Sequence, residues 1–181
     1  MRIKPEDAIV VVVDYQEKLL PAMHKLDELM IQSKKLLAGL KELDIPMIVS
    51  QQYTKGLGPT PQELIDCMGD SYKPYEKDSF SVYTDDVIKD AIDKIGKKKI
   101  ILCGTEAHVC VLQTLIDLRE AGYDVYLVAD CIASRSKHDK KLALKRAMGE
   151  GAYITSAEAI LFELTLTSKS EHFRAISKII K

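Results

Sequence analysis

The sequence predicts an α/β protein with a three-layer α/β/α sandwich fold. Short apolar runs alternate along the chain with segments whose apolar side chains recur at helical spacing. Two of the runs, AIVVVV and KIILC, are almost wholly apolar, which is typical of strands covered on both faces in a parallel sheet. Strands that alternate with helices imply right-handed β-α-β crossovers and helices on both faces of one sheet.

The predicted elements follow one another in a regular order. We expect strands at residues 8–13, 46–50, 77–82, 99–103, 123–129 and 152–155. We expect helices at residues 25–43, 63–68, 87–95, 108–120, 139–148 and 172–180, with a further helix capped by Ser156. The stretch QQYTKGLGPTPQ, residues 51–62, is rich in glycine, proline and polar residues and is interpreted as a loop. Because no linker or repeat interrupts this order, we expect one domain over residues 1–181.

Composition and charge narrow the functional classes. The 181 residues carry 26 Lys+Arg against 27 Asp+Glu, a formal net charge of −1. This balance argues against bulk electrostatic capture of nucleic acid or an anionic membrane, because both need a concentrated positive field. No apolar run is long enough to cross a bilayer, and the N-terminus lacks the apolar core and cleavage site of a signal peptide. We therefore expect a cytoplasmic protein without nucleic-acid or membrane partners.

The cysteines and histidines indicate neither a metal site nor a disulfide framework. The four residues of each type are scattered and form no C-x-x-C, H-E-x-x-H or D-x-H spacing. Gly56 and Gly58 form a lone G-x-G followed by Pro59, which is weak evidence for a dinucleotide site. We therefore expect no metal and no cofactor.

The residues that follow the predicted strands point to a site. Carboxyl ends of parallel strands meet at one edge of the sheet, where ligands bind. Asp14 follows the first strand, Lys77 lies at the third, and Cys110 lies in the first helical turn after the fourth. A helix N-terminus and a nearby cation lower the pKa of a thiol, which is about 8.5 in a free cysteine. A carboxylate can take the thiol proton and return it to a leaving group.

These residue types fit acyl transfer through a thioester. The backbone N–H groups of the turn at residues 106–110 could hold the oxyanion of a tetrahedral intermediate. We also predict substrate or oxyanion contacts at six positions: Thr105, Glu106, Gln16, Gln52, Tyr53 and Phe80.

Three segments, VVVVDYQ, EKDSFS and LCGTEAHVCV, resemble the isochorismatase-like cysteine hydrolase family. The family pattern has a strand ending in Asp with Gln two residues on, a Lys followed three residues later by an aromatic residue and Ser, and a strand–Gly–turn–Cys-Val. The matching residues are Asp14, Gln16, Lys77, Phe80, Ser81, Gly104, Cys110 and Val111. The likeness runs from residue 8 to residue 159.

The resemblance implies a six-stranded parallel sheet of order 3-2-1-4-5-6 and an Asp14–Lys77–Cys110 catalytic triad. It also implies a cis peptide bond between Thr105 and Glu106, and a homo-oligomer. Family members that hydrolyse nicotinamide carry a D-x-H metal site after the second strand, where this sequence has QQYT. We therefore expect a metal-independent enzyme that cleaves a C–N bond of a small amide or carbamoyl substrate.

Each prediction has a structural alternative. Cys110 could be a buried structural thiol, Asp14 a helix cap and Lys77 a solvated surface lysine. Packing explains Tyr53 and Phe80 nearly as well as substrate binding does. At the level of function, the alternatives are a catalytically silent binding or assembly protein on the same fold, and a nucleotide- or flavin-binding domain. The amphipathic segment at residues 172–180 could pack on a neighbouring subunit or on its own core.

Overall fold

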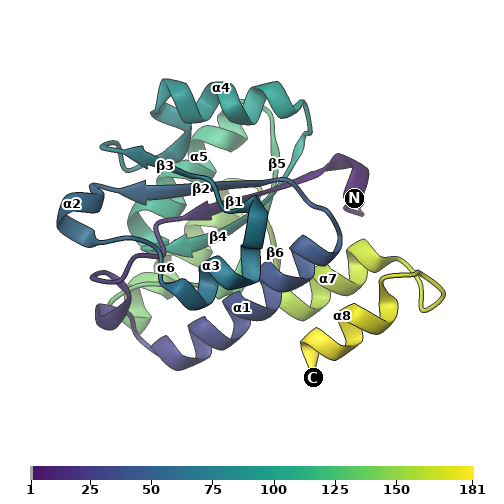
Figure 1. Ribbon diagram of the computed structural model, residues 1–181. Helices are drawn as coiled ribbons and strands as arrows, with labels where there is room; N and C mark the ends of the chain where they lie inside the picture. Colours follow the sequence, from purple (N-terminus) through teal and green to yellow (C-terminus); the bar gives the residue numbers. More distant parts are fainter. Residues whose placement is uncertain (1) are drawn as a thin grey trace.

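A six-stranded parallel sheet forms the centre of the molecule in the computed structural model, which describes residues 2–181 (Figure 1). The strands are β1 (Ala8–Val13), β2 (Met47–Gln52), β3 (Pro74–Lys77), β4 (Lys99–Thr105), β5 (Asp124–Ala133) and β6 (Tyr153–Thr155). Their order across the sheet is β3-β2-β1-β4-β5-β6, and each neighbouring pair is parallel. The predicted fold class and sheet order are therefore confirmed.

Helices cover both faces of the sheet (Figure 1). One face carries α1 (Leu26–Glu42), α3 (Gln62–Met68), α7 (Ala157–Thr165) and α8 (Phe173–Ile180). The other face carries α4 (Asp86–Ile95), α5 (Leu112–Glu120) and α6 (Lys137–Gly149), while the short α2 (Thr54–Leu57) follows β2. The three layers explain why β1 is apolar throughout, since its side chains pack alternately into the two cores and all of them are fully buried.

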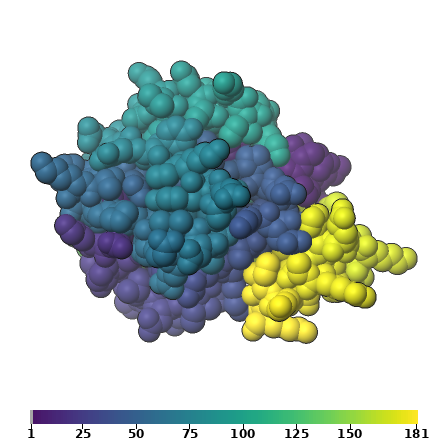
Figure 2. Space-filling model, viewed as in Figure 1, coloured from purple at the N-terminus to yellow at the C-terminus, as the bar shows by residue number. Residues whose placement is uncertain are grey.

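The C-terminal helix packs on its own chain. Ile176 is fully buried in the core that α1 and α7 share, and the rings of Phe162 and Phe173 lie 6.3 Å apart. Lys35 Nζ donates a hydrogen bond of 2.6 Å to the backbone carbonyl of Ile180. Figure 2 shows this segment, in yellow, lying against the body of the molecule. Of the two alternatives for the amphipathic segment, the structure favours packing on its own core.

The third strand is where the sequence prediction fails. We expected it at residues 77–82, but β3 spans Pro74–Lys77, so only Lys77 is common to both. The strand lies at the edge of the sheet, and its sequence PYEK gives little apolar signal. The apolar signal came instead from Phe80, which is 55% exposed, and from Val82, which begins a short 3-10 turn.

Three other boundaries also differ from expectation. The predicted loop at residues 51–62 includes the last two residues of β2 and the helical turn α2. The predicted helix at residues 108–120 is a π-helical turn, Ala107–Val111, followed by α5. β5 also runs four residues further than predicted, to Ala133, past an irregularity in its register with β4 between Leu102 and Gly104.

Candidate active site

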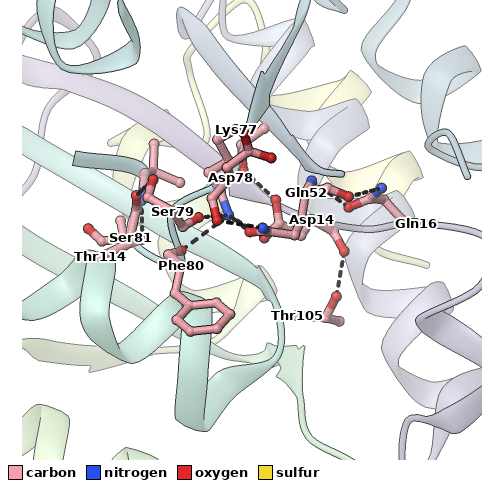
Figure 3. A network of polar contacts seen from close by, with 12 residues as sticks. Asp14, Gln16, Gln52, Lys77, Asp78, Ser79, Phe80, Ser81, Thr105 and Thr114 are labelled. Atoms are coloured by element: carbon pink, nitrogen blue, oxygen red, sulfur yellow. Dashed lines mark hydrogen bonds and ion pairs between the residues drawn. The ribbon is translucent and has the colours of Figure 1, made fainter. Parts of the chain in front are cut away.

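A buried ion pair lies at the carboxyl ends of β1 and β3 (Figure 3). Lys77 Nζ lies 2.7 Å from Asp14 Oδ2, and both side chains are 0% exposed. Asp14 Oδ1 accepts a hydrogen bond of 2.8 Å from the hydroxyl of Ser50 in β2. The two carboxylate oxygens of Asp14 are thus held by residues of β3 and β2. The next helical turn begins only at Leu20, so the alternative of Asp14 as a helix cap is wrong.

The ammonium group of Lys77 is enclosed by acceptors. Besides Asp14, Nζ contacts Gln52 Oε1 at 2.7 Å and the backbone carbonyls of Ser79 and Phe80 at 3.0 and 3.2 Å. An ammonium has only three protons, so these four acceptors engage all of them. The alternative of a solvated surface lysine is therefore wrong. The Lys77 side chain is buried, and its ammonium has no free proton with which to bind a ligand.

The strand β4 approaches β1 so closely that only glycine fits at Gly104. Gly104 pairs with Val13, its φ is +139°, and a Cβ atom there would lie 2.1 Å from the carbonyl oxygen of Val13. The next residue, Thr105, donates a hydrogen bond of 2.6 Å from its hydroxyl to the backbone carbonyl of Asp14. This close approach fixes the segment that follows β4 against Asp14.

Cys110 lies in the π-helical turn that follows this contact. The peptide bond between Thr105 and Glu106 is cis, at the position that the resemblance predicts. The thiol of Cys110 lies near enough to the Asp14 carboxylate for the charge of Asp14 to act on it, and the residue is 8% exposed. The structure therefore brings together Asp14, Lys77 and Cys110, which come from three separate strand ends.

The environment of Cys110 stabilises the protonated thiol. Burial is the largest effect and the negative charge of Asp14 the next, and together they raise the pKa of Cys110 to about 12. The positive charge of Lys77 and the backbone of Glu106 lower this pKa only in part. The expectation of a lowered thiol pKa is therefore wrong, because desolvation and an adjacent carboxylate outweigh the cation. Such a thiol needs a base to react at neutral pH, and the adjacent carboxylate is that of Asp14.

The glutamines predicted to contact substrate hold the strand ends together. Gln16 Nε2 donates to the backbone carbonyls of Gln52 and Gly58 at 2.9 and 2.7 Å, and Gln16 Oε1 accepts from the backbone N–H of Gln52 at 2.7 Å. Gln52 in turn donates from Nε2 to the carbonyl of Asp78 at 2.8 Å and accepts from Lys77. These contacts link β1, β2 and the turn after β3 beneath the site.

Two aromatic residues near the site are open to solvent. Tyr53 is 53% exposed and Phe80 is 55% exposed. Figure 3 shows the ring of Phe80 extending away from the polar contacts around Lys77. Packing therefore leaves about half of each residue uncovered and available to a ligand.

The turn that carries the nucleophile candidate is tied to the segment after β5. Glu106 Oε1 lies 2.6 Å from Arg135 Nε, with side chains that are 13% and 64% exposed. His108 Nδ1 lies 2.9 Å from the hydroxyl of Ser134. Neither Ser134 nor Arg135 was predicted as a site residue, although both follow the predicted fifth strand at the same edge of the sheet. Ser50 was also missed, although a serine at the end of a strand beside Asp14 was a usable signal.

No metal site is found within residues 2–181, where no three His, Cys, Asp or Glu side chains are grouped suitably. At the position of the D-x-H motif, Gln51 Nε2 donates to Thr60 Oγ1 at 3.0 Å and to the hydroxyl of Tyr72 at 2.8 Å. Thr54 Oγ1 lies 3.3 Å from Gln51 Oε1. Amide and hydroxyl groups thus satisfy one another at this position. Within the same described residues, no helix is long and apolar enough to span a membrane.

The sheet order and the polar groups at its carboxyl edge define an α/β protein of the isochorismatase-like hydrolase class. Residues 8–159 match the family model of the isochorismatase domain. The chain therefore belongs to the isochorismatase family, as the sequence resemblance indicated. Membership supports a hydrolase role for the protein.

Comparison with individual proteins agrees with this assignment. The chain is 34% identical over 179 residues to isochorismatase domain-containing protein 2 of Danio rerio, covering 99% of this chain and 89% of that protein. It is similar to the solved structure of the MAR1 ribonuclease of Caenorhabditis elegans, with a TM-score of 0.93, 36% identity, and coverage of 99% and 92% of the two chains. It also shares its fold with the YcaC protein of Escherichia coli, described as an octameric hydrolase of unknown specificity. There the TM-score is 0.94, the identity 22%, and the coverage 99% and 89%.

Proposed function

We propose that this protein is a metal-independent cysteine hydrolase that cleaves the C–N bond of a small amide or carbamoyl compound. In this proposal Cys110 is the nucleophile and Asp14 the general base. The observation that carries it is the proximity of the buried Cys110 thiol to a carboxylate that is itself held by Lys77. A protonated thiol beside a buried, oriented carboxylate is the arrangement that nucleophilic catalysis with a paired base requires.

The first half of the reaction forms a thioester. Asp14 takes the proton of the Cys110 thiol as the sulfur attacks the carbonyl carbon, and a C–S bond forms. The carbonyl oxygen becomes an oxyanion, which backbone N–H groups of the turn at residues 106–110 stabilise, apart from that of Val109, which donates to the carbonyl of Glu106. The C–N bond then breaks, and Asp14 gives its proton to the leaving nitrogen.

The second half releases the acid. Asp14 takes a proton from a water molecule as the water oxygen attacks the thioester carbonyl. The C–S bond breaks, the carboxylic or carbamic acid departs, and the sulfur recovers its proton from Asp14. Asp14 therefore carries the proton in both halves, whereas Lys77 acts through Asp14 by holding and stabilising its carboxylate.

Substrate contacts follow from the groups that remain free around Cys110. The exposed rings of Tyr53 and Phe80 offer apolar surface to the body of a small substrate. Thr105 and Glu106 supply the backbone of the oxyanion turn, and their side chains are held by Asp14 and Arg135. Gln16 and Gln52 act as positioning residues in this proposal, because their amides already bind the backbone and Lys77.

The proposal is tested by hydrolysis of a panel of small primary amides and N-carbamoyl compounds, followed through release of the amine. Turnover of at least one compound is expected for the wild type, with loss in Cys110→Ala and in Asp14→Asn. Cys67→Ala is the matched control, since Cys67 is a half-buried thiol on α3 outside the site. Full turnover in Cys110→Ala, or no turnover of any compound by the wild type, would contradict the proposal.

A catalytically silent binding or assembly protein is the main alternative, and the raised pKa of Cys110 gives it support. It predicts that the wild type hydrolyses none of the panel. The similar Caenorhabditis elegans structure is described as a ribonuclease, so RNA is added to the panel as a further substrate. Cleavage of RNA that persists in Cys110→Ala would indicate chemistry other than the one proposed here.

Two further predictions extend the proposal beyond the site. We infer a homo-oligomer, which light scattering coupled to gel filtration would measure as a mass that is a multiple of the chain mass of 20.3 kDa. We also infer a cytoplasmic location, which cell fractionation would test.

A further inference from the structure

One cavity of the molecule shares no residue with the Asp14–Lys77–Cys110 site. It has a volume of about 740 Å³ and is bounded by the N-terminal ends of α1 and α6 and by the carboxyl half of β5. Cavities of this size are typical of small-molecule sites, which span about 300–1,000 Å³. The proposed hydrolysis assigns no part to this cavity.

The cavity combines an apolar floor with a cationic rim. Its apolar lining residues are Leu29, Ala129, Ile132 and Leu144, of which Leu29 and Ile132 belong to the buried core. Four lysines line it against two carboxylates, namely Lys25, Lys137, Lys140 and Lys141 against Glu28 and Asp130. An excess of positive charge around an apolar floor favours a ligand with an apolar body and an anionic head.

The carboxylates in the lining do not neutralise the lysines of α6. Glu28 binds Lys25, with Nζ–Oε1 at 2.7 Å. Asp130 Oδ1 accepts a hydrogen bond of 2.9 Å from the backbone N–H of Ala157. Within residues 2–181, the side chains of Lys137, Lys140 and Lys141 form no hydrogen bond and no ion pair. Three lysines of α6 therefore line the same cavity without a direct partner for their side chains.

Lys140 is the lysine placed deepest. It is half-buried, and burial lowers the pKa of its ammonium, while the charge of Asp130 opposes this lowering only in part. A half-buried ammonium that lacks a direct partner gains stability when an anion contacts it. The α6 N-terminus adds a favourable dipole at the same end of the cavity.

We propose that this cavity binds a small organic anion, with a carboxylate or phosphate head at Lys140 and Lys137 and an apolar body against Ala129 and Leu144, the two apolar lining residues that are only partly buried. The proposal stands independently of the hydrolysis at Cys110. Binding of such an anion neutralises the lysines of α6 and covers the apolar floor.

Binding is measured by isothermal titration with three probes: benzoate, phenyl phosphate and the neutral benzamide. Saturable binding of at least one anion is expected, with no binding of benzamide, and the better anion identifies the head group. Lys140→Met keeps the apolar stem and removes the charge, so the affinity is expected to fall about tenfold. Lys145→Met, on the same helix outside the cavity, is the matched control and is expected to bind as the wild type does.

The same titration in Cys110→Ala separates this inference from the proposed function, because anion binding is expected to be unchanged in a protein without the nucleophile. Thermal unfolding of each variant checks that it is folded. The proposal would be overturned by the absence of saturable anion binding, by equal binding of benzamide, or by unchanged affinity in a folded Lys140→Met variant.

Discussion

The ammonium of Lys77 lies 2.7 Å from Oδ2 of Asp14, and neither side chain reaches solvent. A buried ion pair gains Coulomb energy in a low dielectric but loses the hydration of both ions, so it adds little net stability by itself. Here Ser50 donates a further hydrogen bond to the carboxylate of Asp14, and Gln52 and two backbone carbonyls accept hydrogen bonds from the ammonium of Lys77. The pair therefore acts as a fixed, fully bonded support for the carboxylate beside Cys110.

Lys77→Met is expected to lower the free energy of unfolding by about 3–5 kcal/mol, because it leaves the buried carboxylate of Asp14 without its counter-ion. Urea unfolding followed by circular dichroism measures this change. Lys73→Met, at an exposed position just before β3, is the matched control and is expected to stay within about 0.5 kcal/mol of the wild type. Equal stability of the two variants would mean that the ion pair does not form.

Asp14→Asn is expected to lower the pKa of Cys110 while abolishing turnover. The negative charge of Asp14 raises this pKa, so its removal leaves Lys77 to stabilise the thiolate. The measurement is the rate of Cys110 alkylation by iodoacetamide against pH, followed by mass spectrometry. The wild-type rate is expected to rise without a plateau up to about pH 10, below the pKa of about 12. A variant that alkylates no faster than the wild type at neutral pH would contradict the electrostatic role of Asp14.

Ser50→Ala is expected to reduce both stability and turnover, because Ser50 donates to the ionised group at the centre of the site. Hydrogen bonds to charged groups contribute about 1.5–3 kcal/mol, and those between neutral groups about 0.5–1.5 kcal/mol. Ser33→Ala is the matched control, since Ser33 is an equally buried serine that donates to the neutral hydroxyl of Tyr15. Ser33→Ala is expected to lose stability but to keep its turnover. Unaltered turnover in Ser50→Ala would show that catalysis does not need the hydrogen bond from Ser50 to Asp14.

Gly104→Ala is expected to displace β4 from β1, since the added methyl group would lie 2.1 Å from the carbonyl oxygen of Val13. Overpacking of this kind costs about 1–3 kcal/mol, and the φ of +139° adds strain for any residue with a Cβ atom. Because Thr105 follows directly, the contact to Asp14 and the turnover are expected to be lost as well. Gly149→Ala, at the end of α6 where a Cβ atom meets nothing within 4 Å, is the matched control and is expected to unfold at or above the wild-type temperature.

The sequence was informative where burial and local pattern coincide. The run at residues 8–13 predicted a central strand because both faces of β1 are covered, and the rule that ligands bind at the carboxyl ends of parallel strands then placed Asp14 and Cys110 together. The third strand was misplaced because an edge strand with the sequence PYEK contains few apolar residues. The apolar residue Phe80 was instead interpreted as part of the strand, although it is exposed and lies outside it.

The electrostatics of the site could not be predicted from residue types. A nearby lysine predicted a lowered pKa for Cys110, but the direction depends on how deeply the thiol is buried and on which ion lies nearer to it. The partners of the two glutamines are also invisible in the sequence, since Gln16 reaches a residue 42 positions away. The lysine-lined cavity was missed because its residues come from three elements that no motif connects.

Trapping of the thioester tests the central claim most directly. Protein turning over an amide from the panel is quenched in acid, digested and analysed by peptide mass spectrometry. The account predicts an adduct with the mass of the acyl group on the peptide that contains Cys110, and none in Asp14→Asn. Turnover without any adduct on Cys110, undiminished in Cys110→Ala, would contradict it.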